Sequence, residues 1–109
     1  MKLLRNIFFG TNKQKDSIDE LDYILTSLPE DKKQLETLFK ERKDEIAHVG
    51  GVNKFKDSYS EDYYNEEIGM IQNDVNQKLG RLKKFGEKYP SVLNKKDIET
   101  QINSFKGLL

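Results

Sequence analysis

The feature that most constrains the fold of this 109-residue chain is a stripe of apolar residues in its C-terminal half. The stripe contains Tyr64, Ile68, Ile71, Val75, Leu79, Leu82, Phe85 and Tyr89. Steps of three and four residues place these side chains on one face of an α-helix. Ser58 and Glu61, just before the stripe, have the spacing of a capping box, and Pro90 follows it. The pattern predicts one long helix from about Tyr59 to Lys88.

Two more capping boxes, each a Ser followed three residues later by a Glu, lie in the N-terminal half of the chain. They are Ser17 with Glu20 and Ser27 with Glu30. Behind the first box, Ile18, Leu21, Ile24, Leu25 and Leu28 share one helical face. Behind the second, Pro29 suits the first turn of a helix, where its missing N–H costs nothing. The boxes predict two separate helices, one beginning at Ser17 and one running from about Pro29 to His48.

The remaining signals complete an all-α fold. Gly50 and Gly51 favour the left-handed conformation that ends a helix, and Asn94 with Asp97 three residues on caps a final helix. No stretch alternates strictly between apolar and polar residues, so no strand is predicted. We therefore expect a single domain over residues 1–109. Its architecture is a small antiparallel helical bundle of about four helices, with the helix 59–88 as the long central element.

Charge is distributed in blocks although the net charge is zero. Residues 16–31 and 57–77 each carry six acidic residues and no basic one, whereas residues 78–96 carry seven basic residues against Glu87. One interpretation is that acidic and basic ends of antiparallel helices lie side by side, where each exposed pair contributes under ~1 kcal/mol. The other is that a block faces a partner of opposite sign and speeds association.

The composition argues against catalysis. Without Cys the chain has no thiolate nucleophile and no Cys-ligated metal site. His48, the one histidine, lies at the predicted end of a helix, where capping is the simpler role. The carboxylate clusters lack an accompanying His or a shaped calcium loop. We therefore expect no enzymatic activity, no cofactor and no metal site.

The first candidate binding surface combines aromatic and acidic residues around the start of the long helix. It contains Phe55, Tyr59, Glu61, Asp62, Tyr63, Glu66 and Glu67. Tyrosine gives a large contact area at low entropy cost and is enriched at binding hot spots. The alternative is that these rings close the open end of the bundle as part of its core.

A second candidate face lies beside the apolar stripe of the same helix. Gly69, Asn73, Asn76 and Gly80 follow one another in steps of three and four. Each interior glycine costs roughly 1 kcal/mol relative to alanine, which indicates that something approaches this face closely. A neighbouring helix of the same chain is the first interpretation, and a second copy or a foreign partner is the other.

Residues 1–15 form a basic amphipathic segment that could be separate from the bundle. Its apolar residues, Leu3, Leu4, Ile7, Phe8 and Phe9, are accompanied by Lys2, Arg5, Lys13 and Lys15. We expect the segment to pack on the bundle. Weak peripheral contact with an anionic membrane is the alternative.

These features predict a cytoplasmic, non-enzymatic protein-binding module, such as an inhibitor, adaptor or immunity-type factor. Its partner would carry a basic or apolar surface, and a homodimer is compatible with the same residues. The high Lys, Asn and Ile content hints at a low-GC bacterium, its phage or a mobile element. The alternatives are a small nucleic-acid-binding regulator that uses the basic block 78–96, and a peripheral membrane protein. Two acidic blocks and a pI near 6.6 argue against general phosphate binding.

Overall fold

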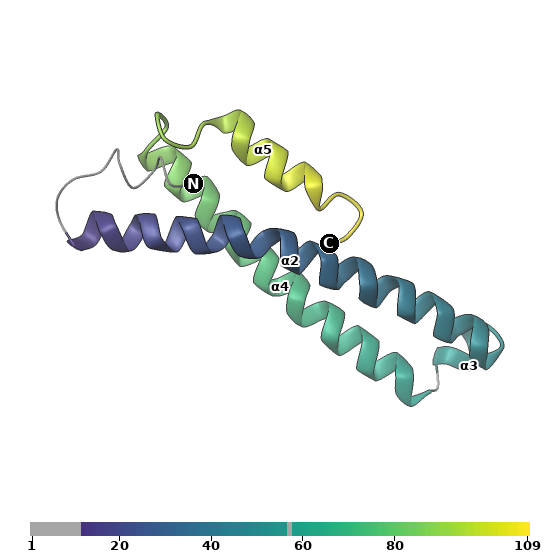
Figure 1. Cartoon of the computed structure of the whole chain (residues 1–109). Helices are drawn as coiled ribbons and strands as arrows, with labels where there is room; N and C mark the ends of the chain where they lie inside the picture. Colours follow the sequence, from purple (N-terminus) through teal and green to yellow (C-terminus); the bar gives the residue numbers. More distant parts are fainter. Residues whose placement is uncertain (1–11, 57) are drawn as a thin grey trace.

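The computed structural model describes residues 12–56 and 58–109, with side chains from Ile18 onward. Every regular element in these ranges is an α-helix: α2 (Asn12–Val49), α3 (Val52–Lys56), α4 (Tyr59–Lys88) and α5 (Lys95–Ser104). The helices α2 and α4 form an antiparallel hairpin that α3 closes at one end (Figure 1). α5 folds back along the C-terminal half of α4. The predicted all-α bundle is confirmed.

The molecule is elongated. Its principal extents are 58 × 25 × 19 Å. Its radius of gyration of 18.0 Å exceeds the roughly 13 Å expected of a compact domain of this length. The C-terminal segment is fixed halfway along the hairpin, because the Gln72 side-chain amide donates a hydrogen bond to the Leu108 carbonyl at 2.9 Å. Among the described residues, the half of the hairpin nearer α3 is therefore only two helices thick (Figure 1).

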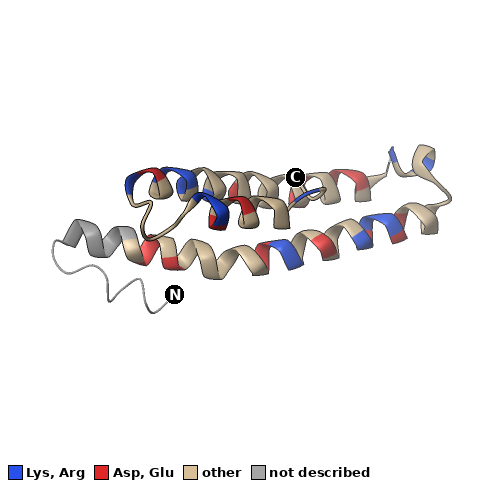
Figure 2. Cartoon of the chain, turned by 90° about the horizontal axis from the view of Figure 1, so that it is seen from above, with Lys and Arg blue, Asp and Glu red and all other residues tan. Residues whose placement is uncertain are grey.

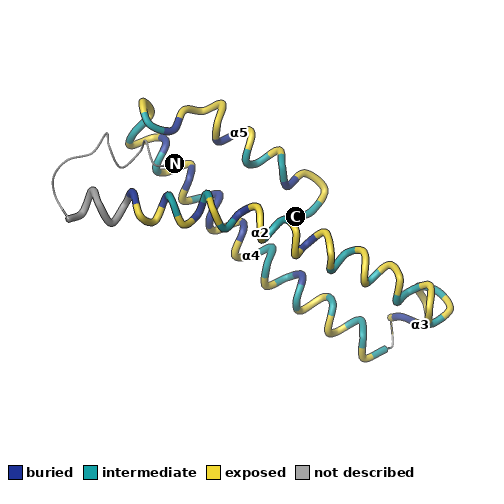
Figure 3. The backbone as a smooth tube through the Cα atoms, in the orientation of Figure 1, coloured by how far each residue is buried: buried dark blue, intermediate teal, exposed yellow. Residues whose placement is uncertain are grey.

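The core follows the seam between α2 and α4 and extends under α5 (Figure 3). It consists of Leu21, Ile24, Leu28, Leu35, Ile68, Val75, Leu79, Leu82, Leu93, Ile98 and Phe105. Burial of each such side chain contributes about 1.5–3 kcal/mol. The predicted stripe of α4 is confirmed, with Tyr64, Ile71 and Phe85 half-buried against the same cluster.

Most predicted helix ends are confirmed by their hydrogen bonds. The hydroxyl oxygen of Ser58 accepts from the Glu61 N–H at 3.3 Å, and α4 runs from Tyr59 to Lys88 as expected. The Asn94 side-chain oxygen accepts from the Asp97 N–H at 2.9 Å. Gly50 and Gly51 follow α2 with φ angles of 102° and 121°, in the region that favours glycine.

The prediction of two separate helices before Gly50 is wrong, because α2 is continuous through Pro29. The Ser27 hydroxyl does not cap a new helix but donates to the Ile24 carbonyl at 3.2 Å. The Thr26 hydroxyl likewise donates to the Asp22 carbonyl at 2.8 Å. Such bonds back to the preceding turn keep a hydroxyl residue inside a helix. Near its middle α2 changes direction (Figure 1), as expected for an internal proline.

The structure differs from the sequence-based prediction at both ends of the hairpin. α2 begins at Asn12, so Ser17 lies within a helix, and α2 with 38 residues is longer than α4 with 30. The short helix α3 was not predicted. The described part leaves out residues 1–11 and the side chains of residues 12–17. The prediction that the basic N-terminal segment packs on the bundle therefore lies outside the described residues. None of the described helices combines the length and apolar character that a membrane crossing requires.

Candidate functional site

The predicted acidic and aromatic surface lies at the α3 end of the hairpin, where α4 begins. Tyr59, in the first turn of α4, is 94% exposed, and Tyr63, one turn later, is 52% exposed. The Tyr63 ring rests edge-on against Tyr64, with ring centroids 5.1 Å apart and planes at 73°. This T-shaped geometry is a favourable arrangement of aromatic rings. Tyr63 is thus supported by the Tyr64 ring, whereas Tyr59 extends into solvent.

The two other rings of the cluster are part of the core. Phe55 of α3 is 5% exposed, and its ring centroid lies 6.5 Å from that of Tyr64. The prediction that Phe55 contacts a partner directly is therefore corrected, because its side chain is covered by α2 and α4. Phe55 and Tyr64 close the end of the hairpin, while Tyr59 and Tyr63 remain on the surface. The cluster therefore contains two core rings, Phe55 and Tyr64, and two exposed rings, Tyr59 and Tyr63, that are available for binding.

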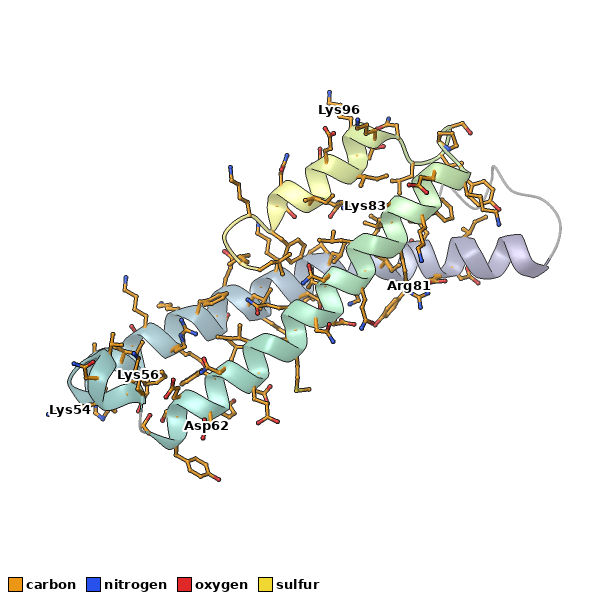
Figure 4. The ribbon with its side chains drawn as sticks, turned by 180° about the vertical axis from the view of Figure 1, so that it is seen from behind. Lys54, Lys56, Asp62, Arg81, Lys83 and Lys96 are labelled. Atoms are coloured by element: carbon orange, nitrogen blue, oxygen red, sulfur yellow. The ribbon has the colours of Figure 1, made fainter. Side chains whose placement is uncertain are left out.

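Carboxylates surround the exposed rings. Asp62 and Glu66 are exposed, while Glu61 and Glu67 are half-buried. Figure 4 shows Asp62 at the same end of the molecule as Lys54 and Lys56 of α3. The acidic character extends onto α2. Burial and then the charges of Glu41 and Glu45 raise the pKa of Tyr64 above 10.0.

The second candidate face is open to solvent. Apart from the adjoining turns of α4 itself, a Cβ atom added at Gly69 or Gly80 would meet no described atom within 4 Å, and Asn73 and Asn76 are exposed. The expectation that a neighbouring helix of the same chain approaches these glycines is therefore wrong for the described part of the chain. A second copy or a foreign partner remains the alternative for this face.

The close helix contact of α4 is made instead by Gly86, which the sequence reasoning missed. A Cβ atom there would overlap the Ile98 Cδ1 atom of α5 and lie 3.1 Å from the Leu93 carbonyl oxygen. Its sequence signal was a third glycine inside the helix, one turn before Pro90. Met70 was also missed. It is 61% exposed and lies seven residues after Tyr63, on the same side of α4.

Of the two interpretations of the charge blocks, pairing within the fold is seen between the acidic block 16–31 and the basic block 78–96. The Lys78 ammonium is buried and lies 2.6 Å from an Asp31 oxygen and 2.9 Å from an Asp74 oxygen. Near the start of α2, Arg81 pairs with Glu20. Figure 2 shows the acidic positions of the first part of α2 and the basic positions at the end of α4 at the same end of the hairpin. Lys78 and Arg81, two cations of the 78–96 block, are thus already paired with carboxylates of the same chain, whereas a nucleic-acid surface would use them to contact phosphates.

Other chemistry receives no support from the geometry. His48 is exposed in the last turn of α2. Within the ranges that the structure describes, no three His, Asp or Glu side chains come together as a metal site would require. Comparison with protein families, with curated proteins and with solved structures finds no significant match.

Proposed function

We propose that this chain is a non-enzymatic protein-binding module that contacts its partner through Tyr59 and Tyr63. The observation that carries the proposal is the exposure of Tyr59, whose relative solvent accessibility is 94%. Because Phe55 and Tyr64 already close this end of the hairpin, the Tyr59 ring adds nothing to the core. A large exposed ring on a helix is a ready anchor at low entropy cost.

The surroundings of the two tyrosines define the partner's chemistry. Asp62 and Glu66 flank them, and the pKa of the adjacent Tyr64 is raised by burial first and then by the charges of Glu41 and Glu45 on α2. The matching partner surface has an apolar pocket for a tyrosine ring with Lys or Arg around it. Such a module acts by occupying a partner's surface, as an inhibitor, adaptor or immunity-type factor in the cytoplasm.

Site-specific crosslinking in the source cells tests the proposal and captures the partner. A photoreactive phenylalanine analogue replaces Tyr59 or Tyr63 in turn, and replaces the exposed Lys40 of α2 as the matched control. We expect one crosslinked protein from positions 59 and 63 and none from position 40. The same products from all three positions would contradict the proposed surface.

Affinity for the captured partner, measured beside stability, then distinguishes rings that contact the partner from rings that belong to the core. Tyr59→Ala and Tyr63→Ala should each weaken binding by about 2 kcal/mol with little change in melting temperature. Phe55→Ala, as the contrasting variant, should lower the free energy of unfolding by about 3–5 kcal/mol because it empties a buried position. Glu66→Lys should mainly slow association and change its salt dependence. If Tyr59→Ala and Tyr63→Ala lowered stability as much as affinity, the two rings would belong to the core and not to a binding surface.

A further inference from the structure

Two open grooves lie between α2 and α4. The first, of about 220 Å³, has a floor of Leu21, Ile24 and Phe85 and a rim of Arg81, Lys84, Lys88 and Glu20, and we refer to it as the basic groove. The second, of about 440 Å³, has a floor of Leu38 and Ile71 and a rim of Glu30, Glu41, Glu67 and Lys33, and we refer to it as the acidic groove. Each groove thus combines an apolar floor with a rim dominated by one sign of charge.

Both grooves lie on the face of the hairpin that α5 leaves open. On α4 the residues Glu67, Ile71, Arg81 and Phe85 are separated by four, ten and four positions, which keeps them on one side of the helix. Gln72, which bonds to the C-terminal segment, lies on the other side of the core stripe, and Gly86, which contacts α5, lies within the stripe itself. Figure 4 agrees, with Lys83 turned towards α5 and Arg81 turned towards the N-terminal half of α2.

The middle of this face carries the buried ion pair of Lys78 and Asp31, whose side chains are 8% and 15% exposed. The apolar floors are placed symmetrically about this pair. Ile24 and Leu38 each lie seven residues from Asp31 on α2. Ile71 and Phe85 each lie seven residues from Lys78 on α4. The face therefore has an ion-paired centre, in which Lys78 lies between Asp31 and the more exposed Asp74. It has matched apolar positions on both sides of this centre and opposite charges at its two ends.

We propose that this face binds a second copy of the chain in antiparallel orientation, about a twofold axis that passes between the two Lys78–Asp31 pairs. The twofold axis places the basic groove of each copy over the acidic groove of the other. Phe85 then lies over the second copy's Ile71, and Ile24 lies over the second copy's Leu38. A surface of this kind is self-complementary, as a twofold dimer requires. The product is an antiparallel four-helix bundle with α5 on its outer sides.

The shape of the chain supports this occupant. The described part of the chain extends over 58 Å, and among its residues the half of the hairpin nearer α3 consists of α2 and α4 alone. Three residues on the groove floors, Leu38, Ile71 and Phe85, are half-buried at the edge of the core cluster, whereas Leu21 and Ile24 are already buried within it. A second copy covers these positions along the length of the hairpin, whereas a small ligand would fill one groove only.

Charge reversal on the two rims tests the proposal by sedimentation velocity over micromolar to millimolar concentrations. The unmodified chain should sediment at twice the 12.8 kDa mass of the monomer at the upper end of this range. Glu41→Lys/Glu67→Lys and Lys84→Glu/Lys88→Glu should each weaken self-association at least tenfold, because like charges then face each other. An equimolar mixture of the two variants should restore a dimer, since every rim again meets the opposite charge.

Matched variants exclude a mere effect of net charge. Glu36→Lys/Glu99→Lys and Lys95→Glu/Lys96→Glu change the same charges at exposed positions away from both grooves, and each should dimerise like the unmodified chain. A monomer at every concentration would overturn the proposal, as would a mixture of the groove variants that stays monomeric. Tyr59→Ala should leave dimerisation unchanged, so failure of the dimer and failure of the proposed partner surface are separate results.

Discussion

Individual residues of α4 show how local space determines the effect of a glycine. Gly80 faces open space among the described residues, so its missing side chain only raises the flexibility of the unfolded chain. Gly86 lies against α5, where its missing side chain lets Ile98 and the Leu93 carbonyl come close. The same residue type therefore weakens the helix at one position and permits helix packing at the other.

Alanine substitution at these two glycines should have opposite effects on stability. Gly80→Ala should raise the free energy of unfolding by about 1 kcal/mol, because alanine favours the helix and meets no neighbour. Gly86→Ala should lower it by about 1–3 kcal/mol, because the added methyl group must displace Ile98. Urea unfolding monitored by circular dichroism measures both changes. A destabilised Gly80→Ala variant would indicate that another part of the chain covers this face.

At the scale of the elements, α2 shows that a proline and two hydroxyl residues do not suffice to end a helix. Leu28 and Leu35, on either side of Pro29, are fully buried against the core. Their packing holds both halves of α2 along α4. The hydroxyl groups of Thr26 and Ser27 bond to carbonyls of the preceding turn. The helix therefore continues with a bend instead of stopping.

Replacing Pro29 should stabilise the protein. Pro29→Ala restores a backbone N–H donor and removes the clash of the ring with the preceding turn, which costs about 3 kcal/mol in a helix interior. Pro29 is exposed, so no core contact is lost. We expect a gain of about 1–3 kcal/mol in the free energy of unfolding, measured in urea. A loss would mean that the bend itself is needed for Leu28 and Leu35 to pack.

Patterns within one segment of the chain predict most of these elements. Periodicity predicted α4 and its core residues, because a buried stripe must repeat with the helix. The end of α2 and the caps of α4 and α5 were predicted because they depend on local residues. The Ser27 box was misleading, since the same residues fit a helix start and a helix interior, and only the burial of Leu28 and Leu35 decides between them.

The candidate site was predictable as a region but not residue by residue. Tyr64 belongs to the periodic stripe, so its burial follows from the pattern. Phe55 lies outside any stripe, and its burial depends on how α3 turns the chain between α2 and α4. The two grooves were also beyond prediction, because each joins residues of α2 to residues of α4 that lie far away in the sequence.

For the molecule as a whole, two protons, one on the buried Lys78 and one on the half-buried Tyr64, connect stability to pH. Burial lowers the pKa of Lys78, but hydrogen bonds to Asp31 and Asp74 and the charges of these carboxylates raise it more, so it lies above 10.5. Burial, with the charges of Glu41 and Glu45, raises the pKa of Tyr64 above 10.0. Both groups hold their protons more tightly in the folded chain than in the unfolded chain. The unfolded state therefore releases protons first as the solution becomes alkaline, and this release favours unfolding.

The protein should accordingly keep its full stability up to pH of about 10 and lose it progressively above that value. Urea midpoints measured from neutral to strongly alkaline pH follow the loss. Tyr64→Phe removes one of the two protons, and Lys78→Arg places a cation beside Asp31 that does not titrate in this range. Each substitution should make the decline with pH shallower, whatever its effect at neutral pH. Tyr59→Phe, which removes the hydroxyl from an exposed ring, is the matched control and should leave the slope unchanged. If stability declined as steeply in the Tyr64 and Lys78 variants as in the unmodified protein, the cause of alkaline unfolding would lie elsewhere in the molecule.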